Sequence, residues 1–139
     1  IGSGLAARKL LTDESNTVCI LAIGKMVGAS LDAAALLAAK GISATVWDVR
    51  SCAPLDQSMI DNASAHRVVI TVEDGIREGG IGMTIEDLVS HAAGANGPSI
   101  EVLGIPKQFI PQAKPDAILS RLGLNAEGIA STVQRLVNN

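Results

Sequence analysis

Residues 71–83 read Thr71-Val-Glu-Asp-Gly-Ile-Arg-Glu-Gly-Gly-Ile-Gly-Met83, and this stretch decides the fold. It begins as the end of an apolar, β-branched run, which is typical of a strand buried on both faces. The acidic pair Glu73 and Asp74 follows, and then a glycine-rich turn leads into residues with helical spacing. This order predicts polar groups at the carboxyl edge of a parallel sheet, where open α/β folds gather their functional loops.

The composition narrows the class of protein. The chain has 139 residues, of which 47% are hydrophobic, so we expect one globular domain with a continuous core. Its only aromatic residues are Trp47 and Phe109, and its net charge is −3 with no basic cluster. Single-stranded nucleic acids are bound by aromatic platforms in basic grooves, so no nucleic-acid role is expected. No apolar run approaches the ~20 residues that span a bilayer, so no membrane role is expected either.

The cysteines and the first residues bear on the cellular context. Cys19 and Cys52 lack CxxC or zinc-site spacing. We therefore expect reduced thiols in a cytoplasmic protein. Ile1-Gly-Ser-Gly4 does not have the charged start and apolar block of a signal peptide. The chain begins with Ile1 rather than Met, which leaves open whether it is a piece of a longer protein or stands alone.

The pattern of elements predicts an α/β fold. Buried strands are expected over 17–23, 43–49, 67–72 and 99–103. Helices are expected from Gly28 to Lys40, from Asp56 to about 65, over 82–92, over about 115–122 and over 125–137. Gly41 is the expected C-cap of the first helix, and Asp56 and Asn125 are expected N-caps. Strands that alternate with helices imply right-handed crossovers and a mostly parallel sheet with helices on both faces.

The first 16 residues differ from the rest. Residues 6–11 form a weaker strand candidate, and the connection over 12–16 is too short for a crossover. A strand joined in this way should pair antiparallel. We therefore divide the single domain into a linker and antiparallel strand over 1–16 and a βαβ core with C-terminal helices over 17–139.

Three strand ends carry the candidate functional residues. Gly24-Lys25, Asp48-Val-Arg50 and Glu73-Asp74 all follow predicted parallel strands, so they should share one edge that forms a pocket or an interface. Asp48 and Arg50 have two open interpretations: a structural ion pair with neighbours, or contacts with another domain or subunit.

Catalytic and ligand-binding interpretations are weak for these residues. Glu73 and Asp74 could be an acid/base pair, but adjacent residues of an extended segment point to opposite faces. The most direct role of Gly79, Gly80 and Gly82 is a tight turn with close helix packing, and an anion at the helix N-terminus is the alternative. Gly24-x-x-x-Gly28 fits neither a phosphate-binding nor a dinucleotide-binding loop. His66 and His91 have no partner at metal or catalytic spacing. We therefore predict no catalytic, cofactor-binding or metal-binding residue.

Several segments in order resemble the C-terminal domain of the transketolase family. They are Ile23-Gly-Lys-Met-Val27, Trp47-Asp-Val-Arg-Ser-Cys-Ala-Pro-Leu-Asp56, His66-Arg-Val-Val-Ile-Thr-Val-Glu-Asp-Gly75 and Gly79-Gly-Ile-Gly82. The tail is similar to the 1-deoxy-D-xylulose-5-phosphate synthase branch of that family, through Val102-Leu-Gly-Ile-Pro-Lys-Gln-Phe-Ile-Pro111 and Leu122-Gly-Leu-Asn-Ala-Glu-Gly-Ile129. The alternatives are the same domain of a 2-oxoacid dehydrogenase E1 β subunit or of a transketolase, and a stand-alone, non-catalytic interaction module.

The resemblance implies a three-layer α/β/α domain with a five-stranded mixed sheet whose first strand is antiparallel. It implies a homodimeric parent enzyme that uses thiamine diphosphate and Mg²⁺ to condense pyruvate with glyceraldehyde 3-phosphate, with loss of carbon dioxide. In the family the cofactor lies between the two preceding domains, and no Gly-Asp-Gly…Asn motif occurs here. This segment is thus expected to support assembly without being catalytic alone. Its expected contacts with the preceding domains come from Asp48, Arg50, Glu73, Asp74, Gly79, Gly80 and Gly82. Ser51-Cys-Ala53 departs from the bulkier residues usual in the family at that point.

Overall fold

The strand over Val18–Ile23 (β2) lies at the centre of the sheet. Its residues from Val18 to Ala22 are fully buried, as the unbroken apolar run predicts. The computed structural model describes residues 7–50, 55–76, 80–105, 119 and 122–138. Within them the strands form a five-stranded sheet in the order β1-β3-β2-β4-β5. The other strands are β1 (Arg8–Leu11), β3 (Ala44–Asp48), β4 (Val68–Ile76) and β5 (Ser99–Ile105).

The first strand runs opposite to the others, as its short connection predicts. β1 pairs antiparallel with β3, with Arg8 opposite Asp48, whereas β2, β3, β4 and β5 pair in parallel. β4 runs to Ile76, four residues beyond the predicted end, because β5 continues beside it past a register shift between Val72 and Ile76. The acidic pair therefore lies within the strand and not after it.

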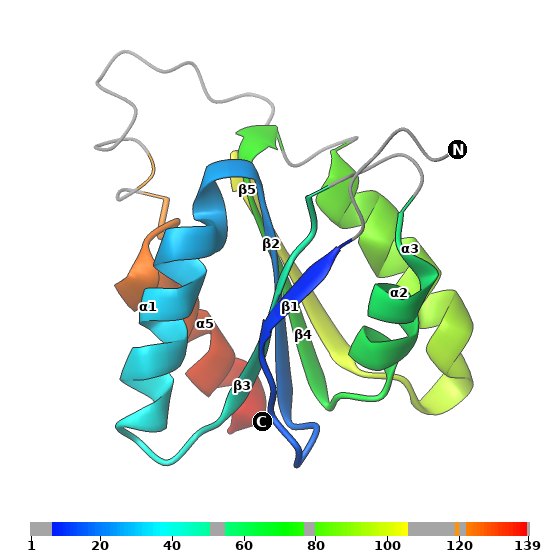
Figure 1. Ribbon diagram of the computed structural model, residues 1–139, viewed down its shortest axis with the longest axis horizontal. Helices are drawn as coiled ribbons and strands as arrows, with labels where there is room; N and C mark the ends of the chain where they lie inside the picture. Colours follow the sequence, from blue (N-terminus) through cyan, green and yellow to red (C-terminus); the bar gives the residue numbers. More distant parts are fainter. Residues whose placement is uncertain (1–6, 51–54, 77–79, 106–118, 120–121, 139) are drawn as a thin grey trace.

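Helices cover both faces of the sheet (Figure 1). α1 (Val27–Ala38) and α5 (Ala126–Val137) lie on one face, and α2 (Gln57–Ser64) and α3 (Ile81–Ala93) lie on the other. Short 3₁₀ turns precede α1 (η1, Gly24–Met26) and follow α3 (η2, Gly94–Asn96). The result is the expected three-layer α/β/α arrangement.

The helix ends follow from local chemistry. The Asp56 carboxylate accepts the Ser58 amide hydrogen at 2.9 Å, and the Asn125 side chain accepts that of Gly128 at 2.8 Å. Both predicted N-caps are confirmed. α1 ends at Ala38, two residues before the predicted Lys40, and Gly41 lies in the following turn with a φ of +80°. Of the predicted helix over 115–122, all but residues 119 and 122 lie outside the described residues.

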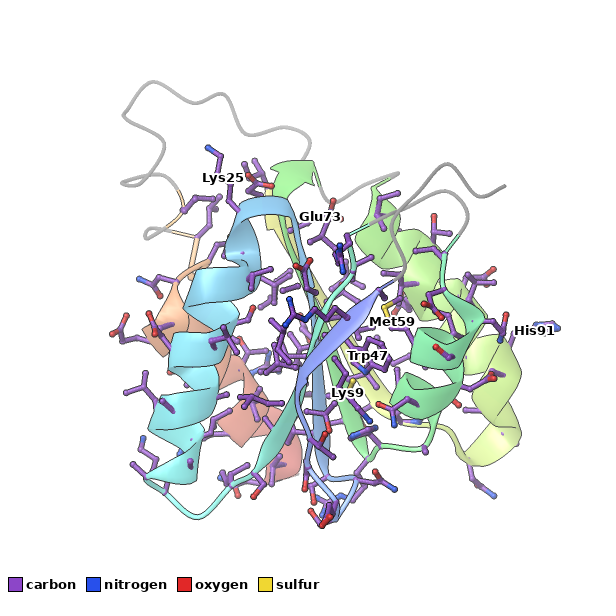
Figure 2. The ribbon with its side chains drawn as sticks, in the orientation of Figure 1. Lys9, Lys25, Trp47, Met59, Glu73 and His91 are labelled. Carbon is purple, nitrogen blue, oxygen red and sulfur yellow. The ribbon has the colours of Figure 1, made fainter. Side chains whose placement is uncertain are left out.

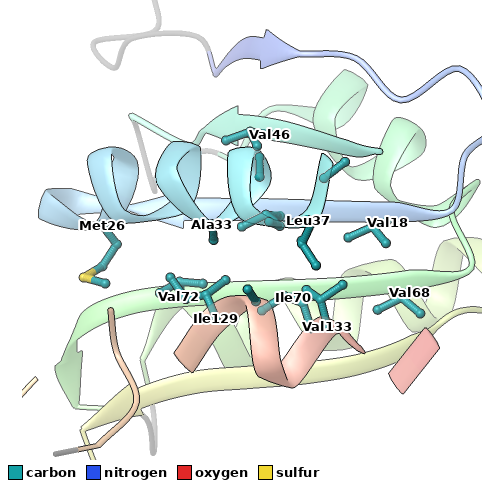
Figure 3. Close-up of a cluster of buried hydrophobic side chains, with 14 of the residues drawn as sticks. Val18, Met26, Ala33, Leu37, Val46, Val68, Ile70, Val72, Ile129 and Val133 are labelled. Carbon is teal, nitrogen blue, oxygen red and sulfur yellow. The ribbon is translucent and has the colours of Figure 1, made fainter. Parts of the chain in front are cut away.

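Alternating strand residues divide the core into two layers. Val18 and Ile20 of β2 pack with α1 and α5 in the cluster that Figure 3 shows, whereas Cys19 and Leu21 pack with α2 and α3. Cys19 is a free, fully buried thiol, and burial raises its pKa. Its reduced state stays a prediction, and burial with a raised pKa is typical of a structural thiol rather than a reactive one. Cys52 lies outside the described residues.

Candidate functional site at the carboxyl edge of the sheet

The topology creates one switch point, between β2 and β4. β2 is followed by α1 on one face, whereas β4 is followed by α3 on the opposite face. Open α/β sheets form a crevice at the carboxyl ends of two such strands. The register places Ile23 opposite Glu73 across the switch point, and Ala22 opposite Asp48 on the other side of β2. The candidate residues of the three strand ends therefore share one edge, where Figure 2 shows Lys25 and Glu73.

Glu73 is buried at this edge and holds the start of α3. Its side chain is 6% exposed, and its Oε1 accepts the amide hydrogen of Gly82 at 2.9 Å. Gly82 is the second residue of α3, so its amide has no acceptor within the helix. A carboxylate at this position also interacts favourably with the positive end of the helix dipole. Glu73 therefore caps a helix from a neighbouring strand.

Gly82 is required because α3 approaches the sheet closely. A Cβ atom there would lie 2.7 Å from the Thr71 hydroxyl, 2.8 Å from Val102 Cγ1 and 3.1 Å from Glu73 Oε1. The Thr71 hydroxyl is fully buried and has no hydrogen-bond partner among the described residues. Gly82 thus serves close packing of α3, which was the more direct prediction for this residue. Gly80 is the N-cap residue of α3, and Gly79 lies outside the described residues.

Asp74 lies on the opposite face of the sheet from Glu73. Its Oδ1 is beside Gly24, where an added Cβ atom would lie 3.0 Å from it. One carboxylate of the pair thus lies at the start of α3 and the other beside the turn that leads into α1. The two groups cannot share a proton site, as the alternation of strand side chains predicts.

Asp48 is the last residue of β3 and Arg50 lies two residues further on, and the two side chains form no ion pair. Asp48 is half-buried and Arg50 is exposed. Neither side chain has a hydrogen bond or ion pair to the rest of the described chain. Arg50 has a φ of +63°, in the left-handed region that few non-glycine residues adopt. Of the two interpretations of these residues, the contact with another domain or subunit is the one that stays open.

The opposite edge of the sheet carries a polar network that the sequence did not reveal. His66 is 3% exposed; its Nδ1 lies 2.8 Å from the Asn62 carbonyl and its Nε2 lies 2.9 Å from the Thr45 hydroxyl. The Thr45 hydroxyl also accepts the Asp13 amide hydrogen at 2.8 Å. Because a carbonyl oxygen can only accept, Nδ1 carries the proton and a neutral ring satisfies every bond. Burial lowers the pKa of His66 below 6.5.

Asp13 organises the turn between β1 and β2 at the same edge. Its buried carboxylate accepts amide hydrogens from Ser15, Thr17 and Val18 at 3.0, 2.8 and 3.1 Å, and a short hydrogen bond from the Ser15 hydroxyl. Burial pushes the pKa of Asp13 upward, but these hydrogen bonds together outweigh it and hold the pKa below 3.8. Both His66 and Asp13 have structural roles, whereas His91 is exposed on α3 (Figure 2).

Within the described residues, no group of three or more His, Cys, Asp or Glu side chains could hold a metal ion. None of the described helices is both long and apolar enough to cross a membrane.

The chain matches the profile of a known family. The family described as "Transketolase, C-terminal domain" matches residues 8–129. The chain belongs to the transketolase C-terminal domain family. One relative of this chain is the 1-deoxy-D-xylulose-5-phosphate synthase of Renibacterium salmoninarum. It is 39% identical over 132 residues, which are 95% of this chain and 20% of that protein. The synthase of Magnetococcus marinus is 37% identical over 138 residues, 99% of this chain and 21% of that protein. The chain thus spans about one fifth of the length of these relatives.

Solved structures agree with this membership. A chain titled "Split gene transketolase, inactive beta4 tetramer" superposes with a TM-score of 0.80 at 29% identity, covering 94% of this chain and 42% of that one. Transketolase from Pichia stipitis in complex with sedoheptulose 7-phosphate superposes with a TM-score of 0.66 at 18% identity, covering 96% of this chain and 18% of that one. The second match supports the fold alone. The predicted fold class and family are confirmed.

Proposed function

We propose that this chain is the C-terminal domain of a longer 1-deoxy-D-xylulose-5-phosphate synthase. Such an enzyme condenses pyruvate with glyceraldehyde 3-phosphate and releases carbon dioxide, in the synthesis of isoprenoid precursors. The observation that carries the proposal is the set of relatives with this name, which match 95% and 99% of the chain at 39% and 37% identity. A third synthase, from Kitasatospora griseola, is 42% identical over 120 residues.

The domain's own part in this enzyme is assembly and not catalysis. Within the described residues, no three acidic, histidine or cysteine side chains converge on a point where Mg²⁺ could bind. The amide of Gly82, which could bind a phosphate at the start of α3, already donates to Glu73. We therefore assign the cofactor and its Mg²⁺ to the remaining domains and derive no catalytic step from this chain.

The carboxyl edge is the proposed contact with those domains. Glu73 and Gly82 form the buried part of this edge, whereas Arg50, Asp48 and Asp74 are charged and form no ion pair with any described residue. Charges left unpaired within a domain suit an interdomain interface, which is more polar than an obligate one. The parent is proposed to be a cytoplasmic homodimer.

A transketolase is the second candidate, favoured by the TM-score of 0.80 with the split-gene transketolase chain. That protein is titled an inactive tetramer of β subunits, so a similar domain occurs in a subunit without activity of its own. The 2-oxoacid dehydrogenase and the non-catalytic module remain as outcomes of the experiment below.

The experiment uses the complete reading frame that contains this chain. The purified protein is given pyruvate, thiamine diphosphate and Mg²⁺, with and without glyceraldehyde 3-phosphate, and carbon dioxide and sugar phosphate are both measured. Carbon dioxide release coupled to deoxyxylulose phosphate formation is the expected result. Release that needs an artificial electron acceptor would identify a dehydrogenase, ketol transfer between sugar phosphates would identify a transketolase, and no reaction would leave the non-catalytic module.

A further inference from the structure

Arg50 has a backbone conformation that its side chain does not favour. Its φ of +63° places it in the left-handed region, where every residue with a Cβ atom is strained relative to glycine. Asn16 is the other described non-glycine residue with a positive φ, and asparagine adopts this region readily. The turn at Asn16 is also held by backbone hydrogen bonds to Asp13 and Arg67. Arginine has no such local advantage, so glycine or asparagine would suit the position of Arg50 better.

The fold makes no use of the strained arginine side chain. Arg50 is exposed, and its guanidinium has no hydrogen bond or ion pair with any residue that the structure describes. Backbone strain that persists without an internal benefit points to a role outside the domain. The position agrees with this, because Arg50 lies two residues beyond the carboxyl end of β3, at the edge proposed to face the other domains.

The charges around Arg50 indicate which group its guanidinium binds. The three strand ends also carry the carboxylates of Asp48, Glu73 and Asp74, and Glu73 occupies the amide at the start of α3. A phosphate dianion would be repelled by these carboxylates, and the Gly82 amide at the start of α3 cannot offset that repulsion because it already donates to Glu73. A single carboxylate carries half of that charge, and its two oxygens match the planar fork of a guanidinium.

We propose that Arg50 is a docking residue, whose guanidinium pairs with a carboxylate of a neighbouring domain in the longer protein. This inference rests on the proposed assembly role and adds to it the residue and the chemistry of its partner. The strain at Arg50 is tolerated because the pair forms in the assembled protein. The domain by itself loses nothing when the guanidinium is removed.

Three variants separate strain from charge. Arg50→Gly relieves the strain and removes the guanidinium, Arg50→Ala keeps the strain and removes the guanidinium, and Arg50→Lys keeps a charge without the fork. Lys40→Ala is the matched control, because it removes the same charge from an exposed residue that follows the other end of α1, away from this edge. Each is made in the 139-residue chain, for thermal melting, and in the complete protein, for domain association by limited proteolysis and subunit association by sedimentation.

The 139-residue chain and the complete protein should respond differently when the Arg50 guanidinium is removed. In the 139-residue chain Arg50→Gly melts no lower than the original protein. In the complete protein Arg50→Gly and Arg50→Ala raise the rate of cleavage between the domains at least tenfold, Arg50→Lys has an intermediate effect, and Lys40→Ala has none. A melting temperature of the chain that falls by about 5 °C in Arg50→Gly, or a complete protein insensitive to both Arg50→Gly and Arg50→Ala, would overturn the proposal.

Two features of the experiment distinguish a carboxylate partner of Arg50 from a role in the reaction and from an anion site. Proteolysis and sedimentation do not depend on the reaction, so the result on Arg50 stands whether or not the complete protein makes deoxyxylulose phosphate. Inorganic phosphate is then compared with chloride at equal ionic strength. Melting that rises with phosphate in the original protein but not in Arg50→Ala would identify an anion site and refute the carboxylate partner; equal melting in both salts is expected.

Discussion

Replacing Gly82 with alanine tests how closely α3 packs against the sheet. Helix propensity alone favours alanine over glycine inside a helix by about 1 kcal/mol. The added Cβ atom, however, would lie 2.7 Å from the Thr71 hydroxyl and 2.8 Å from Val102 Cγ1, inside the contact limits of both. Val102 lies on β5 and Thr71 on β4, so neither can withdraw without moving a strand. The start of α3 must therefore move outward.

The magnitude follows from three contributions. Overpacking of a well-packed core costs about 1–3 kcal/mol. Outward movement of α3 also stretches the bond from the Gly82 amide to the buried Glu73 carboxylate, and hydrogen bonds to charged groups contribute about 1.5–3 kcal/mol. After subtraction of the gain in helix propensity, we expect Gly82→Ala to lower the free energy of unfolding by about 2–4 kcal/mol.

The chain offers a matched control in Gly28, which lies in the first turn of α1. A Cβ atom there would meet nothing within 4 Å, so Gly28→Ala should raise the free energy of unfolding by about 0.5–1 kcal/mol. Urea unfolding of both variants measures the two effects. In the double variant with Thr71→Ala, part of the cost of Gly82→Ala should be recovered, because the hydroxyl nearest to the new methyl group is gone. A Gly82→Ala protein as stable as the original would refute the close contact between α3 and the sheet.

Four further predictions concern the buried polar groups. Thr71→Val removes an unpaired hydroxyl and should raise the urea midpoint, corresponding to about 1 kcal/mol; a lower midpoint would reveal a partner for that hydroxyl. Glu73→Ala should cost about 2 kcal/mol in urea unfolding and Glu73→Gln less, since the amide oxygen still accepts the Gly82 hydrogen; equal losses would contradict the cap. His66 has a lowered pKa in the folded state, so as the pH drops the unfolded chain takes up the imidazole proton before the folded chain does. The free energy of unfolding should therefore fall as the pH drops below 6.5. A His66→Gln protein whose stability has the same pH dependence would show that His66 is not the cause. Asp13 also has a lowered pKa, so its contribution to the free energy of unfolding should be complete above pH 3.8 and lost as the pH falls through the pKa of the folded state. The free energy of unfolding of Asp13→Asn should be lower by about 2 kcal/mol at neutral pH, and this variant should lack the acid transition.

Much of the fold could be predicted because its determinants are local. Apolar runs bounded by turn residues indicate the buried strands, and the caps Asp56 and Asn125 lie within three residues of the amides that they accept. The short connection over 12–16 requires an antiparallel first strand, as β1 shows. The location of the candidate site also follows from the sequence, since residues that end parallel strands must share one edge.

Only the tertiary structure decided what each residue at that edge does. Burial of Glu73 against the Gly82 amide depends on where α3 crosses the sheet, and the space around Gly82 depends on Val102, twenty residues further along. The network of His66 joins residues from β3, α2 and the turn before β2. A sequence pattern reports burial and periodicity, which are properties of neighbours along the chain. Hydrogen-bond partners and steric room are properties of neighbours in space, and they exist only after the strands have paired and the helices have packed.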